Sequence, residues 1–196
     1  MQRLTIQPLQ ILQRLSLAVL LASSAAQAAT YSLDSGSSVT YTASAGEGDR
    51  WNGRAPLENL VLELDVQKPL GAKFTVTLRP ERFDTGNSIR DANARNEVFR
   101  TGQFPEITFR SSRIEGDSSP LLEGQSRRFK LVGKLTVTNT TREVALNAQV
   151  TKKGEKLEVQ AGFGFLLSSF QLTRPRFLWI VVDDALSLNM KFTASP

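Results

Sequence analysis

The chain has 196 residues, with 24 Lys and Arg against 19 Asp and Glu, and it contains neither His nor Cys. Without these two residue types there can be no Ser-His-Asp triad, no Cys nucleophile, and no zinc, haem iron or copper bound through His or Cys. The formal net charge of +5 is spread along the chain rather than gathered in one Lys/Arg block, so we do not expect nucleic-acid binding. No catalytic residue, metal site or cofactor is predicted.

Residues 1–28 have the features of a cleavable secretory signal peptide. Arg3 and Arg14 give a positive start, residues 15–22 are apolar, and Ala26-Gln27-Ala28 fits the small-x-small cleavage rule. A membrane-spanning helix would need about 20 apolar residues, which is more than this segment offers. No Cys follows the cleavage site to carry a lipid anchor. We therefore expect export into a bacterial periplasm.

Residues 29–196 are dominated by a period of two, which predicts half-buried antiparallel strands. Turn-forming residues such as Lys68-Pro69-Leu70-Gly71 and Lys153-Gly154 separate the alternating segments. The pattern predicts an all-β domain, a closed antiparallel barrel of about eight strands, because a flat sheet would expose long edges. An immunoglobulin-like sandwich is the alternative. The alternating segments are residues 39–44, 62–66, 74–78, 107–110, 129–137, 144–150, 157–161 and 186–192.

One segment, residues 88–100, breaks the alternation and predicts a short helix between strands. Asn87 or Ser88 can cap its first turn, and Asp91 places negative charge where the helix dipole favours it. We interpret Asp84-Thr85-Gly86-Asn87 as the turn that seats this helix, with side-chain oxygens accepting from free backbone N–H groups.

The inward positions of the predicted strands are almost all apolar, and small residues fall among the large ones. An eight-stranded barrel is just wide enough to be filled by side chains or to hold one ligand, so a packed core and a cavity both fit. A long apolar tail needs no specific polar partner, because burial gains about 25 cal/mol per Å². The residues predicted to contact such a ligand are Tyr41, Phe74, Val76, Phe109, Leu131, Leu135, Leu146, Phe163, Phe165, Phe170, Phe177, Trp179 and Met190.

Two charged pairs near the C-terminal strands have candidate roles. Arg174 and Arg176 flank Pro175 and could hold a phosphate or a quinone oxygen at the barrel mouth, but a solvated pair in a turn is the interpretation that we favour. Asp183 and Asp184 are adjacent, and neighbours in a strand point to opposite faces. We therefore expect a strand-end role for them rather than a shared proton.

Several motifs in order resemble the YceI-like family of bacterial, lipocalin-like lipid-binding proteins. They are Phe83-Asp84-Thr85-Gly86-Asn87, Arg90-Asp91, Phe104-Pro105-Glu106-Ile107-Thr108-Phe109 and Gly133-Lys134-Leu135-Thr136-Val137, followed by a fitting closing segment over residues 170–188. The resemblance implies an eight-stranded barrel around a tunnel that holds a polyisoprenoid, such as a prenyl quinone or a polyprenyl phosphate. Family members often carry His near the first strand and in the Gly-Leu-Thr strand, and this chain has none there.

We therefore expect a protein that binds a long apolar isoprenoid lipid inside the barrel as a periplasmic carrier or scavenger, without catalysis. A barrel with a solid core that serves as an envelope interaction or stress protein is the alternative. An enzyme that uses carboxylates or Tyr is the third hypothesis. The mild positive charge leaves open a weak attraction to anionic membrane surfaces, and the sequence also leaves a homodimer open.

Overall fold

The structure is a computed structural model and describes residues 28–46, 48–177 and 180–196. The only α-helix in this part of the chain is α1 (Ser88–Asn93), which continues as a π-helical turn, η3 (Ala94–Val98). Three single 3-10 turns are η1 (Pro69–Gly71), η2 (Pro80–Arg82) and η4 (Ser168–Phe170). The strands are β1 (Ala29–Leu33), β2 (Ser38–Ala45), β3 (Asp49–Pro56), β4 (Asn59–Leu64), β5 (Lys73–Leu78), β6 (Ile107–Gly116), β7 (Ser126–Val137), β8 (Thr140–Lys153), β9 (Lys156–Leu166), β10 (Arg176–Phe177), β11 (Ile180–Val181) and β12 (Ala185–Ser195).

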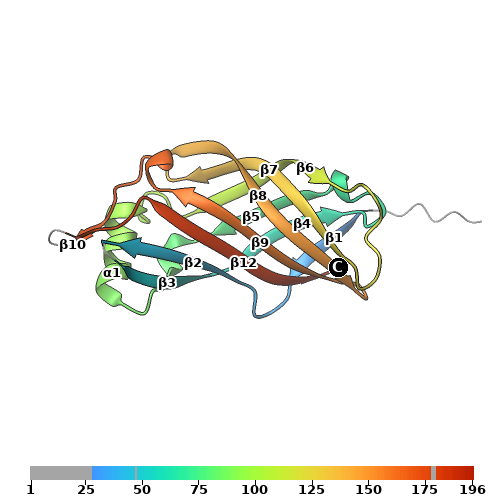
Figure 1. The fold of residues 1–196 in the computed structure, drawn as a ribbon, viewed down its shortest axis with the longest axis horizontal. Coiled ribbons are helices and arrows are strands. Elements are labelled where there is room, and N and C mark those ends of the chain that lie inside the picture. Colours follow the sequence, from blue (N-terminus) through green and yellow to red (C-terminus); the bar gives the residue numbers. More distant parts are fainter. Residues whose placement is uncertain (1–27, 47, 178–179) are drawn as a thin grey trace, which may run out of the picture.

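Eight strands close into an antiparallel barrel in the order β1-β4-β5-β6-β7-β8-β9-β12, and β12 returns to pair with β1 (Figure 1). The predicted all-β barrel with one short helix is therefore confirmed. None of the helices in the described ranges is long and apolar enough to cross a membrane.

The barrel wall differs between its two ends because β12 pairs with β1 at one end and with β2 at the other. Its last residues, Ala194 and Ser195, pair with β1, whereas Ser187 to Lys191 pair with β2. β2 turns back into β3, and the outer edge of β3 is held only by a bridge between Arg54 and Asp84. At this end the wall is thus completed by a hairpin and by the segment around α1 rather than by a continuous sheet.

The interior is tightly packed at one end of the barrel and open at the other. On the inward face of β12, Phe192 and Ala194 are buried, whereas Leu186, Leu188 and Met190 are only half-buried. On the neighbouring strand β9, Leu157 and Val159 are buried and Ala161 and Phe163 are half-buried, whereas Phe165 is buried again. Because the half-buried side chains still point inward, their exposed surface faces space inside the barrel.

Aromatic side chains fill the packed end. The rings of Phe74 on β5 and Phe192 on β12 stack with centroids 6.3 Å apart, and Phe109 tilts against Phe74 at 6.0 Å. β5 and β12 are not neighbours in the sheet. The stack therefore spans the interior and ties opposite walls together, which adds to the energy of burial itself.

The segment before α1 folds as its turn chemistry predicts. The Asn87 side chain accepts hydrogen bonds from the N–H groups of Ile89 and Arg90 and so caps the helix. Asp91 accepts from the backbone N–H of Thr85 at 3.0 Å and from its hydroxyl at 2.6 Å. The α-helix is shorter than predicted, because from Ala94 the backbone widens into the π-turn.

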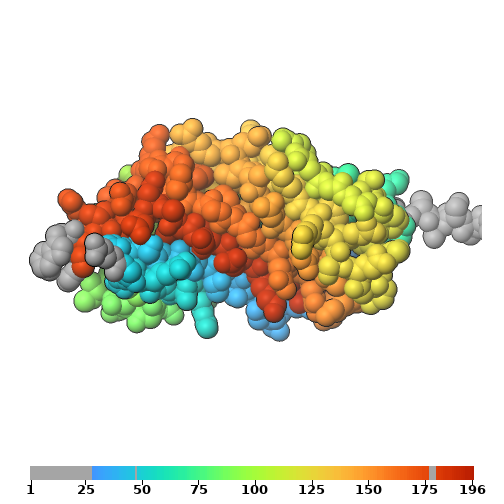
Figure 2. Space-filling model, in the orientation of Figure 1, coloured from blue at the N-terminus to red at the C-terminus, as the bar shows by residue number. Residues whose placement is uncertain are grey.

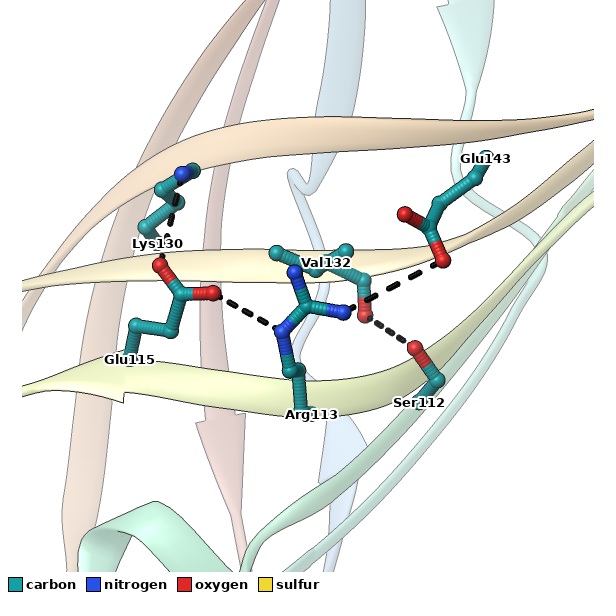
Figure 3. A network of polar contacts seen from close by, with 6 residues as sticks. All are labelled: Ser112, Arg113, Glu115, Lys130, Val132 and Glu143. Carbon is teal, nitrogen blue, oxygen red and sulfur yellow. Dashed lines mark hydrogen bonds and ion pairs between the residues drawn. The ribbon is translucent and has the colours of Figure 1, made fainter.

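The outer face of β6 to β8 carries exposed ion pairs (Figure 3). Arg113 pairs with Glu115 at 2.8 Å and with Glu143 at 4.0 Å, and Lys130 pairs with Glu115 at 3.3 Å. The hydroxyl of Ser112, at a bulge in β6, donates to a backbone carbonyl of β7 at 3.1 Å. Exposed ion pairs contribute at most about 1 kcal/mol each to folding stability. This network therefore supports the register of the strands on the outer face and does not contact the interior of the barrel.

Candidate ligand-binding cavity

A cavity of about 440 Å³ opens at the end of the barrel that carries α1 and the β10–β11 hairpin. Its size lies within the range of about 300–1,000 Å³ that is usual for small-molecule sites. Figure 2 shows three distant parts of the sequence meeting at this end: the β2–β3 hairpin in cyan, the segment around α1 in green, and β10 in orange-red. The cavity is lined mostly by apolar side chains from the barrel strands.

The structure brings most of the residues predicted to contact a ligand to this cavity. Phe74 and Leu131 lie deeper, around a second void of about 50 Å³. Phe170 stacks behind Phe165 with ring centroids 4.9 Å apart and does not line the cavity. Trp179 and the side chain of Phe177 lie outside the described residues. The predicted residues on the cavity wall are Tyr41, Val76, Phe109, Leu135, Leu146, Phe163, Phe165 and Met190.

The sequence analysis missed wall residues of two kinds. Leu186 and Leu188 line the cavity from β12, and their alternation in register with Met190 was the signal that could have found them. The other group lies on β3 and on the segment around α1, which covers the outer edge of β3. The sequence of these parts does not alternate between apolar and polar residues. Its apolar members are Trp51, Phe83, Ile89, Val98 and Phe99.

Aromatic rings join this covering segment to the barrel. Tyr41 lies 5.7 Å from Phe83, and Phe83 meets Phe99 edge to face at 5.4 Å. A Cβ atom on Gly53 would lie only 2.1 Å from Cζ of Tyr41. Glycine at this position of β3 therefore lets the tyrosine ring lie flat against the wall of the cavity.

Polar groups on the wall gather near α1. The Arg90 guanidinium lies 4.6 Å above the Trp51 ring, and its Nε donates to the Thr85 hydroxyl at 2.9 Å. Burial, with a smaller contribution from the negative charge of Asp91, raises the pKa of Tyr41 to about 12. The phenol is thus protonated at neutral pH and can donate a hydrogen bond into the cavity.

Asn93 supplies an unsatisfied acceptor at the same end. The residue lines the cavity, but its Oδ1 atom is buried beneath the surface and has no hydrogen-bond partner among the described residues. An unpaired buried acceptor costs about 1–3 kcal/mol. Native proteins rarely keep such a cost without a reason.

The two arginines flanking Pro175 do not act as a pair. Arg176 lines the cavity mouth, whereas the Nε of Arg174 donates to the backbone carbonyl of Val182 at 2.8 Å. Both side chains are exposed. Arg176 alone is therefore placed to meet a ligand.

The carboxylates near the C-terminus have structural partners. Asp183 accepts from the Ser44 hydroxyl at 2.6 Å, and Asp184 accepts from the backbone N–H of Ser168 at 2.7 Å and from its hydroxyl. These bonds from Ser168 lower the pKa of Asp184. Asp49 is the one carboxylate on the cavity wall among the described residues, so the wall there has no convergent pair for acid–base chemistry.

Comparison with known sequences identifies the domain. The family profile of the YceI-like domain matches residues 31–194. UPF0312 protein YE1254 of Yersinia enterocolitica is 30% identical over 91 residues, which are 46% of this chain and 43% of that protein. Protein YceI of Escherichia coli O157:H7 is 28% identical over 92 residues, 46% and 44% of the two chains. The matched part thus spans less than half the length of these curated relatives.

Solved structures share the fold at low sequence identity. Burkholderia cenocepacia BcnA superposes with a TM-score of 0.69 at 17% identity, and the superposition covers 84% of this chain and 100% of BcnA. A structure described as a polyisoprenoid binding domain from Saccharophagus degradans gives 0.64 at 10% identity, covering 85% and 97%. The profile spans nearly the whole described barrel, and the chain therefore belongs to the YceI-like family.

Proposed function

We propose that the protein binds an isoprenoid lipid in the barrel cavity and carries or scavenges it in the periplasm, without catalysing a reaction. The observation that carries this proposal is the apolar cavity of about 440 Å³, open at the α1 end of an otherwise packed barrel. The polyisoprenoid-binding description of the Saccharophagus degradans relative supports the same ligand chemistry. A wholly solid core does not account for this space.

The apolar wall favours a hydrocarbon tail. Half-buried side chains on the wall, such as Phe163 and Leu188, expose surface that a tail would cover. Covering it gains about 25 cal/mol per Å², less the cost of association and ordering. The wall residues from the original prediction would make these contacts, and no polar recognition is needed along the tail.

The polar groups near α1 set the proposed orientation. Tyr41, Arg90 and Asn93 line the cavity at this end, and Arg176 stands at the mouth. A prenyl lipid has one polar head and one apolar tail, so it fits with its head against α1 and its tail directed toward Met190. Residues 1–28, interpreted as a signal peptide, would deliver the protein to an aqueous compartment where such lipids need a carrier.

The test is mass spectrometry of organic extracts from protein purified without detergent from its native envelope. The proposal predicts one prenyl lipid per chain. Ala43→Phe, which projects a ring into the cavity from β2, should lose the lipid. Thr40→Phe adds the same ring on the exposed face of β2 and should keep it. A clean extract from the native protein, with no rise in Tm on adding prenyl lipids, would refute the proposal.

A further inference from the structure

The mouth of the cavity carries apolar side chains that face water. Ile89 on α1 and Ile180 on β11 both line the cavity, yet they are 73% and 39% exposed. Gly46, in the turn of the β2–β3 hairpin, lies beside Ile180, since a Cβ atom on this glycine would be 3.9 Å from the isoleucine Cγ2 atom. The apolar wall of the cavity thus continues onto the outside of the molecule. Exposed apolar surface around a binding site is typical of a surface that meets a partner.

Arginines surround this apolar rim. Arg176 lines the cavity, Arg174 lies two residues before it, and Arg50 is the second residue of β3, just beyond the turn of the β2–β3 hairpin. All three are exposed. None of them has a carboxylate oxygen within 4.0 Å in the part of the chain that the structure describes. The rim therefore offers positive charge that no ion pair neutralises.

The opposite, packed end of the barrel differs in its charges. Lys152, Lys153 and Lys156 lie around the β8–β9 turn, far from α1 (Figure 1), and each has a carboxylate partner at 2.7–3.4 Å. Leu122 is 51% exposed at this end, but its neighbour Glu123 is the partner of Lys152. Exposed apolar side chains at the packed end thus lie among paired charges, whereas those at the mouth lie among unpaired arginines.

We propose that the mouth of the cavity docks onto an anionic lipid bilayer. Ile89 and Ile180 enter the headgroup layer, and the arginines of the rim contact lipid phosphates, which guanidinium groups bind through two parallel hydrogen bonds. Apolar tips flanked by cations are the combination that binds membrane interfaces. The inference rests on the proposed function, because a docked mouth lets a prenyl tail pass between the bilayer and the cavity without crossing water.

The outer face of the sheet also carries unpaired cations, but it has no apolar side chain to insert beside them. Arg128 on β7 and Lys191 on β12 are exposed and lack a carboxylate oxygen within 4.0 Å among the described residues. The register places Gln149 and Gln160 between them, in one row across four strands. This row attracts an anionic surface through charge alone, so it provides matched controls for the rim.

A first experiment locates the docking surface with a fluorescent label. Because the chain has no Cys, one introduced Cys can carry a polarity-sensitive fluorophore. Ser88→Cys places it beside Ile89, and Ser118→Cys places it in an exposed loop at the packed end. With vesicles of phosphatidylcholine and about 30% phosphatidylglycerol, the label at 88 should brighten and shift to the blue, and the label at 118 should not change. The protein starts at Ala29, so that the apolar residues 15–22 cannot bind the vesicles.

A second experiment measures affinity by flotation with the same vesicles. Ile180→Ser and Arg50→Gln should each weaken binding by about fivefold. Leu122→Ser and Arg128→Gln are the matched controls and should change it by less than about twofold. Binding should be lost with vesicles of phosphatidylcholine alone, and it should weaken as salt rises from about 0.05 to 0.5 M. Unfolding curves of each variant show that the change is not a loss of folding.

The outcomes separate docking from lipid binding. Equal changes at labels 88 and 118, or an Arg128→Gln effect as large as that of Arg50→Gln, would show that another face meets the membrane and would overturn the proposal. Absence of flotation with anionic vesicles would also overturn it, while a prenyl lipid in extracts of the native protein would leave the proposed function standing. Docking through the mouth together with clean extracts and no rise in Tm would refute the prenyl ligand and keep the docking surface.

Discussion

Replacing Asn93 by Leu should stabilise the lipid-free protein. Leu has nearly the shape of Asn but presents two methyl groups where Asn presents an oxygen and a nitrogen. In the native protein the buried Oδ1 atom has no partner, and such an acceptor costs about 1–3 kcal/mol. The substitution removes that cost, and Leu also has a somewhat better helix propensity than Asn.

The expected change in Tm follows from the length of the domain. For a domain of this length a gain of 1 kcal/mol raises Tm by about 2–4 °C, so removing a cost of about 1–3 kcal/mol in Asn93→Leu should raise it by roughly 2–12 °C. Differential scanning calorimetry of delipidated protein measures this directly.

Asn96→Leu provides the matched control. Asn96 lies in the π-turn that directly follows Asn93 but is exposed, so its replacement changes only helix propensity and should raise Tm by about 1 °C or less. If Asn93→Leu raises Tm no more than Asn96→Leu, Oδ1 is already paired with water and the argument from the unsatisfied acceptor is refuted.

Three further changes test the wall and the strand ends. Gly53→Ala should destabilise the fold by about 1–3 kcal/mol and weaken lipid binding, because the new Cβ would lie 2.1 Å from Cζ of Tyr41; unchanged denaturant unfolding would contradict this contact. The pKa of Asp184 is lowered in the folded state, so its contribution is present at neutral pH and is lost as pH falls through the folded pKa. Asp184→Asn should therefore flatten the acid limb of the stability–pH curve below about pH 4, and an unchanged limb would argue against the bonds from Ser168. The pKa of Tyr41 is raised to about 12, so its contribution is complete below about pH 10 and is lost as pH rises toward 12. Tyr41→Phe should make the alkaline limb shallower in urea titrations between pH 9 and 12, and equal slopes would count against burial of the phenol.

The period of two predicted the barrel because it reports which face of a strand is buried. It failed at β3, whose sequence Asp-Arg-Trp-Asn-Gly-Arg-Ala-Pro has no run of large apolar residues. The inward positions there hold Trp51, Gly53 and Ala55, because Tyr41 and the segment around α1 fill the space that larger side chains would need. The need for small residues on β3 comes from contacts with parts of the chain that are distant in sequence, so it leaves no pattern in the local sequence.

The same limit explains why two of the predicted ligand residues lie away from the main cavity. Alternation identified Phe74 and Leu131 as inward, and both do face the interior, but in the deeper void. A period of two says nothing about depth along the barrel axis. Depth depends on strand register and on where the aromatic stack of Phe74 and Phe192 closes the interior, and both depend on pairings between residues far apart in sequence.

The two ends of the barrel differ in how fully the sheet closes and in how fully the interior is filled. At the packed end, β1 joins β4 and β12, so the sheet closes on itself and the interior is filled. At the open end, β3 pairs with β2, but among the described residues its outer edge has only the Arg54–Asp84 bridge, with backbone bonds of 2.7 and 3.0 Å, and the cavity replaces core contacts. Segments with few buried contacts and few backbone bonds are those that open most readily. Since the packed end carries the cooperative core, the α1 end can retain an unpaired acceptor, an empty volume and a strand edge held by a single bridge.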